Sequence, residues 1–461
     1  MKNVLASLRS GDWRALLACF LYFDTGFTVW VLYGPLAPYI GKSITMTPSQ
    51  QGFLVAVPVL AAAILRVTLG NLYQSAPGKQ VALLGVALSA IPVVILPMMG
   101  AMGITATVPV LMVLGVFLGV GGASFAVALP MAGSNYPPRV QGLVLGLAAA
   151  GNIGAVLDGF LFPRLANAYG WQLAVGGALP LLAIAALALY AWANDGSAKS
   201  GSPRRALMGF AVTVVGLIAL VLLVEEGAFG SGKAGVLLLP VMGAALAIAV
   251  LPQRYRAVLA ERDTWVVMLV YSITFGGFVG MSSYVALLLT NLYQMSKVDA
   301  GLFMALLAAI GALVRPIGGL IADRVSGVRA LTVLLAVICC ADMVFALTMP
   351  GVTAGIAVLI VLYVAFGLGN GATFQLVPHR WAGRTGLLSG IVGAAGGIGG
   401  FYLPVVMGIA KESTGSYQMG FATFAVLAGL AFLAVVALRR AWLGWSMRAH
   451  ESGAPHVHAT E

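Results

Sequence analysis

The sequence predicts an all-α polytopic membrane protein, because its composition and its long apolar runs both indicate one. Hydrophobic residues make up 61% of the 461 positions and charged residues only 8%, whereas soluble domains carry about 25% charged residues. Apolar runs repeatedly reach the roughly 20 residues that a helix needs to cross a bilayer. The alternating ten-residue strands typical of a membrane β-barrel are not visible in the sequence.

Fourteen apolar segments are predicted as membrane spans, arranged as six, two and six. The first six lie near 15–40, 51–73, 81–99, 106–130, 141–163 and 171–193. A central pair lies near 206–224 and 234–251, and the last six lie near 264–290, 299–322, 330–350, 354–378, 385–410 and 418–438. If the central pair lies along the membrane surface instead, twelve spans remain with the same orientation.

This arrangement predicts four parts of the chain. Residues 1–193 form an N-terminal six-helix bundle, and residues 194–263 form a central linker with two extra membrane helices. Residues 264–445 form a C-terminal six-helix bundle, and residues 446–461 form a cytoplasmic tail.

The distribution of basic residues predicts that both termini are cytoplasmic. With that topology, 18 of the 25 lysines and arginines fall in inside segments, 5 fall outside and 2 lie within spans. Such an excess on the cytoplasmic side is the rule for membrane proteins. The net charge of +11 therefore reflects the cytoplasmic loops, and it does not indicate a nucleic-acid partner.

The two basic residues within spans occupy matching places in the two halves. Arg66 and Arg315 are 249 positions apart, and Phe125 and Phe374 share that offset. A charge at membrane depth costs from roughly 3 to over 10 kcal/mol, so a chain that carries two in register is expected to use both. Parallel repeats place substrate at the midplane between the halves. We therefore expect one anion between the two guanidinium groups.

A structural role for these arginines is the alternative. Three acids within spans, Asp24, Asp158 and Asp342, are available to form buried ion pairs with them. The matched depth and sequence context of the two arginines favour a shared functional role instead.

Two glycine-rich stretches carry a family resemblance. GLVLGLAAAGNIGAVL (142–157) and GLLSGIVGAAGGIGGFYLP (386–404) resemble the two signatures of the nitrate/nitrite porter family (NarK-like) of the major facilitator superfamily, and FLYFDTGFTVWVLYGPLAPYI (20–40), YSITFGGFVG (271–280) and GLGNGATFQ (367–375) agree with it. The resemblance implies the major facilitator fold, with two six-helix bundles related by pseudo-two-fold symmetry. The signature glycines are Gly151, Gly154, Gly396, Gly397 and Gly399; close approach of backbone to a small substrate and helix packing are their two candidate roles.

The resemblance also implies a set of substrate-binding residues. It places the substrate arginines at Arg66 and Arg315 and an amide donor at Asn152. Its aromatic residues fall on Phe125, Tyr271 and Phe275, with ordinary packing as the alternative role for each. Nitrate is a planar anion, and a planar guanidinium can give it two parallel N–H donors, which lysine cannot do.

Two further aromatic residues and one acid complete the candidates. Phe27 and Phe374 are additional aromatic candidates for the site. Asp24 lies near the middle of the first span, and a buried carboxylate can bind and release a proton. It is the candidate for proton coupling, with a structural hydrogen-bond acceptor as the alternative.

The sequence therefore predicts a secondary active transporter of nitrate, nitrite or both in the bacterial cytoplasmic (inner) membrane. Nitrate/nitrite exchange and nitrate/proton symport both stay open, and a transporter of another small anion is the alternative function. The sequence shows no metal-ligand cluster, nucleophile–base pair or phosphate loop. We therefore expect no enzyme activity, no cofactor and no metal. The expected partners are nitrate, nitrite, protons and membrane lipid, and the expected state is a monomer.

Overall fold

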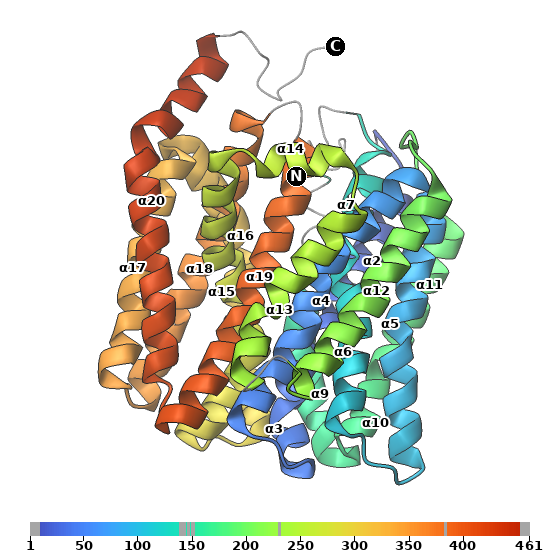
Figure 1. Ribbon diagram of the computed structural model, residues 1–461, viewed down its shortest axis with the longest axis vertical. Helices are drawn as coiled ribbons and strands as arrows, with labels where there is room; N and C mark the ends of the chain where they lie inside the picture. The colour runs from blue at the N-terminus through green and yellow to red at the C-terminus, as the bar shows by residue number, and fades with distance from the viewer. Residues whose placement is uncertain are drawn as a thin grey trace.

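The regular elements of this protein are helices throughout the residues that its computed structural model describes, which are 10–137, 144, 148, 153–228, 232–381 and 385–451. Figure 1 shows them as a bundle of long, roughly parallel helices. Twelve helices within these ranges are long and apolar enough to cross a membrane. The expectation of an all-helical membrane protein is confirmed.

The first group of helices covers the N-terminal part of the chain. It comprises α2 (Trp13–Val31) with α3 (Tyr33–Ser43), α4 (Pro48–Ser75), α5 (Gly78–Ala101), α6 (Val108–Ala123) with α7 (Phe125–Gly133), α9 (Gly154–Tyr169), and α10 (Trp171–Val175) with the short 3-10 turn η3 (Gly176–Ala178) and α11 (Leu179–Trp192). Most of the predicted span 141–163 before Ile153 lies outside the described residues, so only its second half is seen, as α9.

The second group follows after three central helices. The central helices are α12 (Pro203–Glu225), α13 (Gly232–Val250) and the short α14 (Gln253–Leu259), and the second group comprises α15 (Arg262–Tyr293), α16 (Lys297–Val325), α17 (Gly327–Thr348), α18 (Val352–Arg380), α19 (Thr385–Thr414) and α20 (Gln418–Glu451). The described helices lie where the apolar runs predicted them. The counted twelve include α12, whereas the apolar part of α13 is shorter than the others.

Three helix bounds differ from the sequence-based expectation. Residues 253–259, at the end of the predicted linker, form α14, and α9 continues to Tyr169. The helix α20 runs to Glu451, into the stretch that was expected to be a tail. Trp442, which lies beyond the predicted span 418–438, is 1% exposed and its indole nitrogen donates to Asp263 at 3.2 Å. Tertiary packing thus prolongs the helix past its apolar part.

The two ends of the bundle are distinguished by the chain path. In Figure 1, α20 ends at the upper end, where α14 also lies, and α3 lies at the lower end. We call the upper end the terminal face and the lower end the opposite face. The helices α4 and α16 begin at the opposite face, whereas α9 and α19 end there.

Close glycine contacts join the two groups in the half of the bundle nearer the opposite face. A Cβ on Gly52 of α4 would lie 2.3 Å from the carbonyl oxygen of Pro404 on α19. A Cβ on Gly159 of α9 would lie 2.5 Å from the carbonyl oxygen of Gly301 on α16. Only a residue without a side chain allows two backbones to come this close. The two groups are therefore packed tightly together at the opposite face.

The central helices α12 and α13 cover one side of this junction. They pack against each other, and both also contact α4, while α13 reaches α19 of the second group. Figure 1 shows them in green, crossing in front of α4 and α6. The two central helices therefore lie along the seam between α4 and α19.

Candidate functional site

Arg66 lies on α4 and is 4% exposed. Its Nη1 donates to the carbonyl oxygen of Gly393 on α19 at 3.0 Å, and its Nη2 donates to the carbonyl oxygen of Gly122 on α6 at 3.1 Å. Its Nε has no hydrogen-bond partner. A guanidinium carries five N–H donors, so three stay available to a ligand. The side chain joins the two helix groups while keeping donors free.

Aromatic rings surround the Arg66 guanidinium on several sides. Its central carbon lies 5.0 Å from the ring centre of Phe125, 5.8 Å from that of Trp30 and 5.9 Å from that of Phe275. A cation within about 6 Å of a ring centre is attracted by the ring quadrupole. The rings thus stabilise a positive charge in a site that offers it little water.

Tyr271 and Phe275, one turn apart on α15, form a stacked ring pair. Their ring centres are 5.1 Å apart and their planes differ by 9°. Phe374 on α18 packs edge-on against Tyr271, with ring centres 5.0 Å apart. A Cβ on Gly396 would lie 2.6 Å from the Tyr271 ring and 2.8 Å from the Phe275 ring. This signature glycine of α19 therefore makes room for the ring pair.

Arg315, the predicted counterpart of Arg66, lies on α16 and is half-buried. It lies near enough to the Arg66 guanidinium and the Tyr271 hydroxyl for electrostatic interaction with each. A Cβ on Gly371 of α18 would lie 2.1 Å from the Arg315 carbonyl oxygen. Gly122 beside Arg66 and Gly371 beside Arg315 are 249 positions apart, so the repeat extends to the helix that supports each arginine.

The ion-pair alternative for these arginines finds no support among the described residues. The four ion pairs found there do not involve Arg66 or Arg315. Asp158 and Asp342 are buried with unpartnered carboxylate oxygens. Two arginine side chains thus have no acid paired with them in the described part of the chain, which is the electrostatic character of an anion site.

Several predicted residues stand apart from this cluster or cannot be placed. Asn152 and Gly151 lie outside the described residues. Asp24 on α2 is half-buried, and its carboxylate accepts a hydrogen bond from the Gly154 backbone N–H. Phe27 packs edge-on against Trp30, with ring centres 5.1 Å apart, and so reaches Arg66 only through that ring.

The remaining signature glycines mediate helix packing around the site. A Cβ on Gly397 would lie 2.6 Å from the Ala63 side chain, one turn before Arg66. A Cβ on Gly399 would lie 2.2 Å from the Ser272 carbonyl oxygen on α15. They bring α19 onto α4 and α15, which carry Arg66 and the ring pair.

Sequence reasoning missed three contributors to the Arg66 environment. Trp30 stands inside the family-like stretch of the first span, yet only its indole N–H bond to the Pro58 carbonyl oxygen, at 2.9 Å, explains its fixed position. The carbonyls of Gly122 and Gly393 belong to glycine-rich runs. Those runs were a usable signal, because glycine leaves a carbonyl open to a side chain from another helix.

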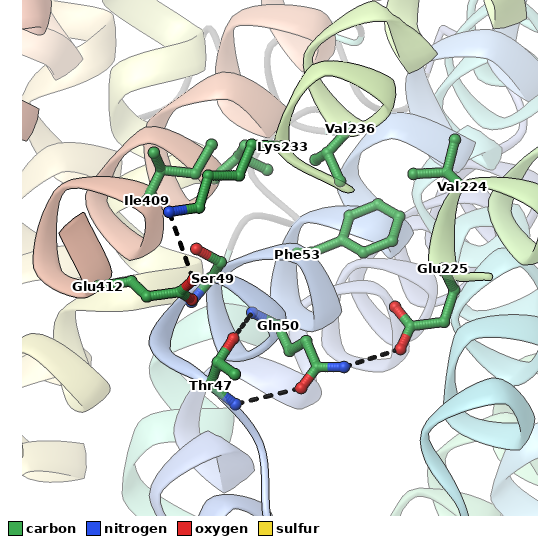
Figure 2. A pocket seen from close by; sticks show the side chains of 11 residues that line it. Thr47, Ser49, Gln50, Phe53, Val224, Glu225, Lys233, Val236, Ile409 and Glu412 are labelled. Atoms are coloured by element: carbon green, nitrogen blue, oxygen red, sulfur yellow. Dashed lines mark hydrogen bonds and ion pairs between the residues drawn. The ribbon is translucent and has the colours of Figure 1, made fainter. Parts of the chain in front are cut away.

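A pocket of about 330 Å³ opens near the opposite face, between α4, the central helices and α19. Figure 2 shows its polar network. Gln50 donates to Glu225 at 2.9 Å, and Glu412 accepts from the Ser49 backbone N–H at 3.1 Å and pairs with Lys233 at 3.4 Å. This network joins both helix groups to the central helices at the place where the two groups meet.

The described residues include no group of three or more His, Cys, Asp or Glu side chains that could hold a metal ion. The central cluster is instead built from guanidinium groups, aromatic rings and backbone carbonyls. Such a set can hold a small flat anion by N–H donors at its edge and by ring faces above and below.

Comparisons with known proteins show which proteins this chain resembles. A family model described as Major Facilitator Superfamily matches residues 17–404. The "Probable nitrate/nitrite transporter NarK2" of Mycobacterium tuberculosis (strain ATCC 25618 / H37Rv) is 30% identical over 409 residues, which is 88% of this chain and 89% of that protein. The "Nitrite extrusion protein" of Bacillus subtilis (strain 168) is 29% identical over 431 residues, with 92% of each chain covered.

Solved structures show the same fold. The xylose transporter XylE from E. coli, in a partially occluded inward open conformation, matches with a TM-score of 0.61 at 16% identity, covering 92% of this chain and 98% of that one. A bacterial homologue of the human lysosomal transporter Spinster, inward-facing and unoccupied, matches with a TM-score of 0.63 at 16% identity, covering 94% and 97%.

Proposed function

Because the chain belongs to the Major Facilitator Superfamily and, within it, to the nitrate/nitrite porter family, we propose that it is a secondary active transporter of nitrate, nitrite or both. It works by alternating access, in which two helix bundles rock around a central anion site. It is a transporter rather than an enzyme, and its cargo is a small flat oxyanion.

The observation that carries this proposal is the buried guanidinium of Arg66, which no described acid neutralises. Its free Nε and remaining Nη hydrogens can donate to two oxygens of one planar anion. Arg315 supplies the second positive charge from the other half of the chain. The ring pair, Tyr271 and Phe275, presents apolar faces to an anion whose charge is delocalised over its plane.

The paired charges also give a reason why the bundles should close only when an anion is bound. An empty site holds two positive charges in a medium of low dielectric, where their repulsion is strong. An anion neutralises part of that charge and permits the bundles to close around it. This requirement favours exchange of nitrate for nitrite, since each return step then needs a bound anion.

Proton symport is the second mode that the residues support. Inward movement of an anion against an inside-negative potential requires about 2.3 kcal/mol per charge per 100 mV. Co-transported protons supply that driving force, and Asp24 is the proton-coupling residue in this proposal. Exchange of equal charges avoids the requirement altogether.

The topology completes the proposal. The protein resides in the bacterial cytoplasmic (inner) membrane as a monomer, with the terminal face and both termini in the cytoplasm, as the excess of basic inside residues favours. Residues 1–193 and 264–445 form the two moving bundles, 194–263 the linker and 446–461 the tail. The central pair α12 and α13 crosses the membrane, which gives fourteen spans. The tight glycine contacts at the opposite face then correspond to closure on the outer side.

A transporter of another small anion is the alternative. Phosphate and carboxylates carry more concentrated charge than nitrate and need more hydrogen-bond donors. The rings of Phe125, Trp30 and Phe275 lie within 6 Å of the Arg66 guanidinium carbon. This apolar lining favours a weakly hydrated anion, and nitrate and nitrite are of that kind.

Transport into liposomes tests the function. Purified protein is reconstituted into vesicles loaded with nitrite or with buffer alone, and nitrate uptake is followed with and without a pH gradient. Nitrate uptake that requires internal nitrite and ignores pH is expected for exchange. Uptake into buffer-loaded vesicles that requires external acid is expected for symport. Absence of nitrate and nitrite movement in every condition contradicts the proposal.

A further inference from the structure

A second polar cluster lies between α2 and α9, within the first helix group. Asp24 and Thr28 are one turn apart on α2, and Gly154 and Asp158 are one turn apart on α9, so each pair shares one helix face. A Cβ on Gly154 would lie 2.6 Å from both the Asp24 carbonyl oxygen and the Thr28 Oγ1. The two faces are therefore in direct contact.

Four side-chain oxygen atoms of this cluster have no hydrogen-bond partner. They are Asp24 Oδ1, Thr28 Oγ1 and both carboxylate oxygens of Asp158. Asp158 and Thr28 are each 0% exposed. Buried polar atoms are nearly always paired, and an unpaired buried carboxylate is especially unfavourable. Four unpaired oxygens at one place therefore indicate a ligand that these oxygens share.

The charges around Asp158 narrow the identity of that ligand. The helix α9 packs against α2, α3, α10 and α16. The titratable side chains that these neighbours bring toward α9 are Asp24 from α2, Tyr39 from α3 and Lys297 from α16, and α10 has no titratable residue. Tyr39 donates to the Pro163 carbonyl at 2.8 Å, and Lys297 packs over the Tyr39 ring at 4.5 Å. Asp24 is the charged group close enough to act on Asp158.

We propose that Asp24 and Asp158 together bind one proton, and that this pair is the proton site of the transporter. A proton converts one carboxylate into a neutral carboxylic acid, whose O–H is a hydrogen-bond donor among these unpartnered oxygens. It also removes the repulsion between two like charges in a medium of low dielectric. A metal cation fits less well, because the Gly154 N–H points its positive end at Asp24.

The position of the pair connects it to the movement of the bundles. Asp158 precedes Gly159, whose backbone packs against Gly301 of the second helix group. Release of the proton leaves two negative charges between α2 and α9, and their repulsion acts on α9 next to this contact. Loss and gain of the proton can thus bias the contact that closes the opposite face.

This inference rests on the proposed transport of nitrate and is tested with the same reconstituted protein. Nitrate-driven proton uptake is measured with a pH-sensitive dye inside the vesicles, and nitrate–nitrite exchange is measured in parallel. Asp158→Asn is expected to reduce nitrate-driven proton uptake to the level of protein-free vesicles while exchange continues. The amide resembles the protonated carboxyl in shape, so the fold is expected to be retained.

Asp342→Asn is the matched control. Asp342 is 1% exposed and has an unpartnered carboxylate oxygen, but it lies on α17 of the second group, away from α9. This variant is expected to keep wild-type proton uptake and exchange. The double variant Asp24→Asn/Asp158→Asn is expected to match each single variant, because residues that share one proton act as a unit.

An infrared difference spectrum between acid and alkaline pH supplies a readout that does not depend on transport. Wild-type protein is expected to show a carboxylic-acid carbonyl band that disappears at alkaline pH, and Asp158→Asn to lack it. The inference is overturned if Asp158→Asn takes up protons at the wild-type level or leaves the carbonyl band unchanged. It is also overturned if the wild-type protein exchanges nitrate without any proton uptake. Absence of any nitrate movement by wild-type protein overturns the proposed function instead.

Discussion

Replacing Arg66 with lysine separates the charge at the central site from its hydrogen-bond geometry. The guanidinium donates to two carbonyls on different helices, at 3.0 and 3.1 Å, and keeps its Nε free. Lysine retains one positive charge but places its three donors on a single nitrogen. It therefore cannot hold both carbonyls and also offer a flat anion two parallel donors.

The expected loss follows from these contacts. A hydrogen bond to a charged group is worth about 1.5–3 kcal/mol, and cation–π contacts with partly dehydrated rings are worth about 1–2 kcal/mol. If Arg66→Lys loses one bidentate donor and part of the ring contact, about 3 kcal/mol of anion stabilisation disappears. Since 1.4 kcal/mol corresponds to a factor of ten, the variant is expected to transport about 100-fold more slowly at low nitrate.

Nitrate–nitrite exchange at nitrate concentrations below saturation measures this loss. Arg164→Lys is the matched control, because Arg164 donates to the Phe160 carbonyl of its own helix and packs over the Phe160 ring at 4.1 Å, away from the central cluster. The control is expected to exchange nitrate like the wild type. A rate for Arg66→Lys equal to that of the control would refute the assignment of Arg66 to the anion site.

Three further predictions concern other parts of the structure. Gly396→Ala adds a methyl group within 2.8 Å of both rings of the ring pair, so nitrate affinity by calorimetry is expected to fall, whereas Gly390→Ala, which meets nothing within 4 Å, leaves it unchanged. Glu412→Gln removes the ion pair with Lys233 in the polar network of the pocket near the opposite face. Partly exposed ion pairs contribute under about 1 kcal/mol, so spin-label distances are expected to show a modest rise in the population that is open at the opposite face. Burial opposes ionisation of Asp195 in the loop after α11, but hydrogen bonds led by that from Lys199 outweigh it and lower the pKa of the Asp195 carboxyl. Its stabilising effect is therefore present above the unfolded pKa of about 3.9 and lost as pH falls through the lower folded pKa, and Asp195→Asn is expected to flatten that acid limb of thermal unfolding in detergent.

Much of the architecture could be predicted because its signals are local and repeated. Apolar run length placed the described membrane helices to within a few residues, apart from extensions such as that of α20. The shared offset of 249 residues identified Arg66 and Arg315 as counterparts, and the structure places both within range of Tyr271. Charge, length and repetition are properties of the chain that need no tertiary contact to be read.

The details of the site could not be predicted because they depend on contacts between distant segments. The Arg66 bond to the Gly393 carbonyl spans 327 positions, and no local pattern specifies which carbonyl of a glycine-rich helix accepts it. Trp30 reaches Arg66 only because its indole N–H is fixed by α4. Asp158 likewise looked unremarkable in the sequence, since only packing of α9 against α2 brings it near Asp24.

A structure determined with nitrate bound tests the central claim most directly. The account predicts flat, trigonal density between Arg66 and Arg315, within hydrogen-bond distance of a guanidinium nitrogen of each, with its plane facing the ring pair. It also predicts that Arg66→Lys protein prepared in the same way lacks this density. Nitrate bound elsewhere, with both guanidinium groups unoccupied by it, would contradict the account.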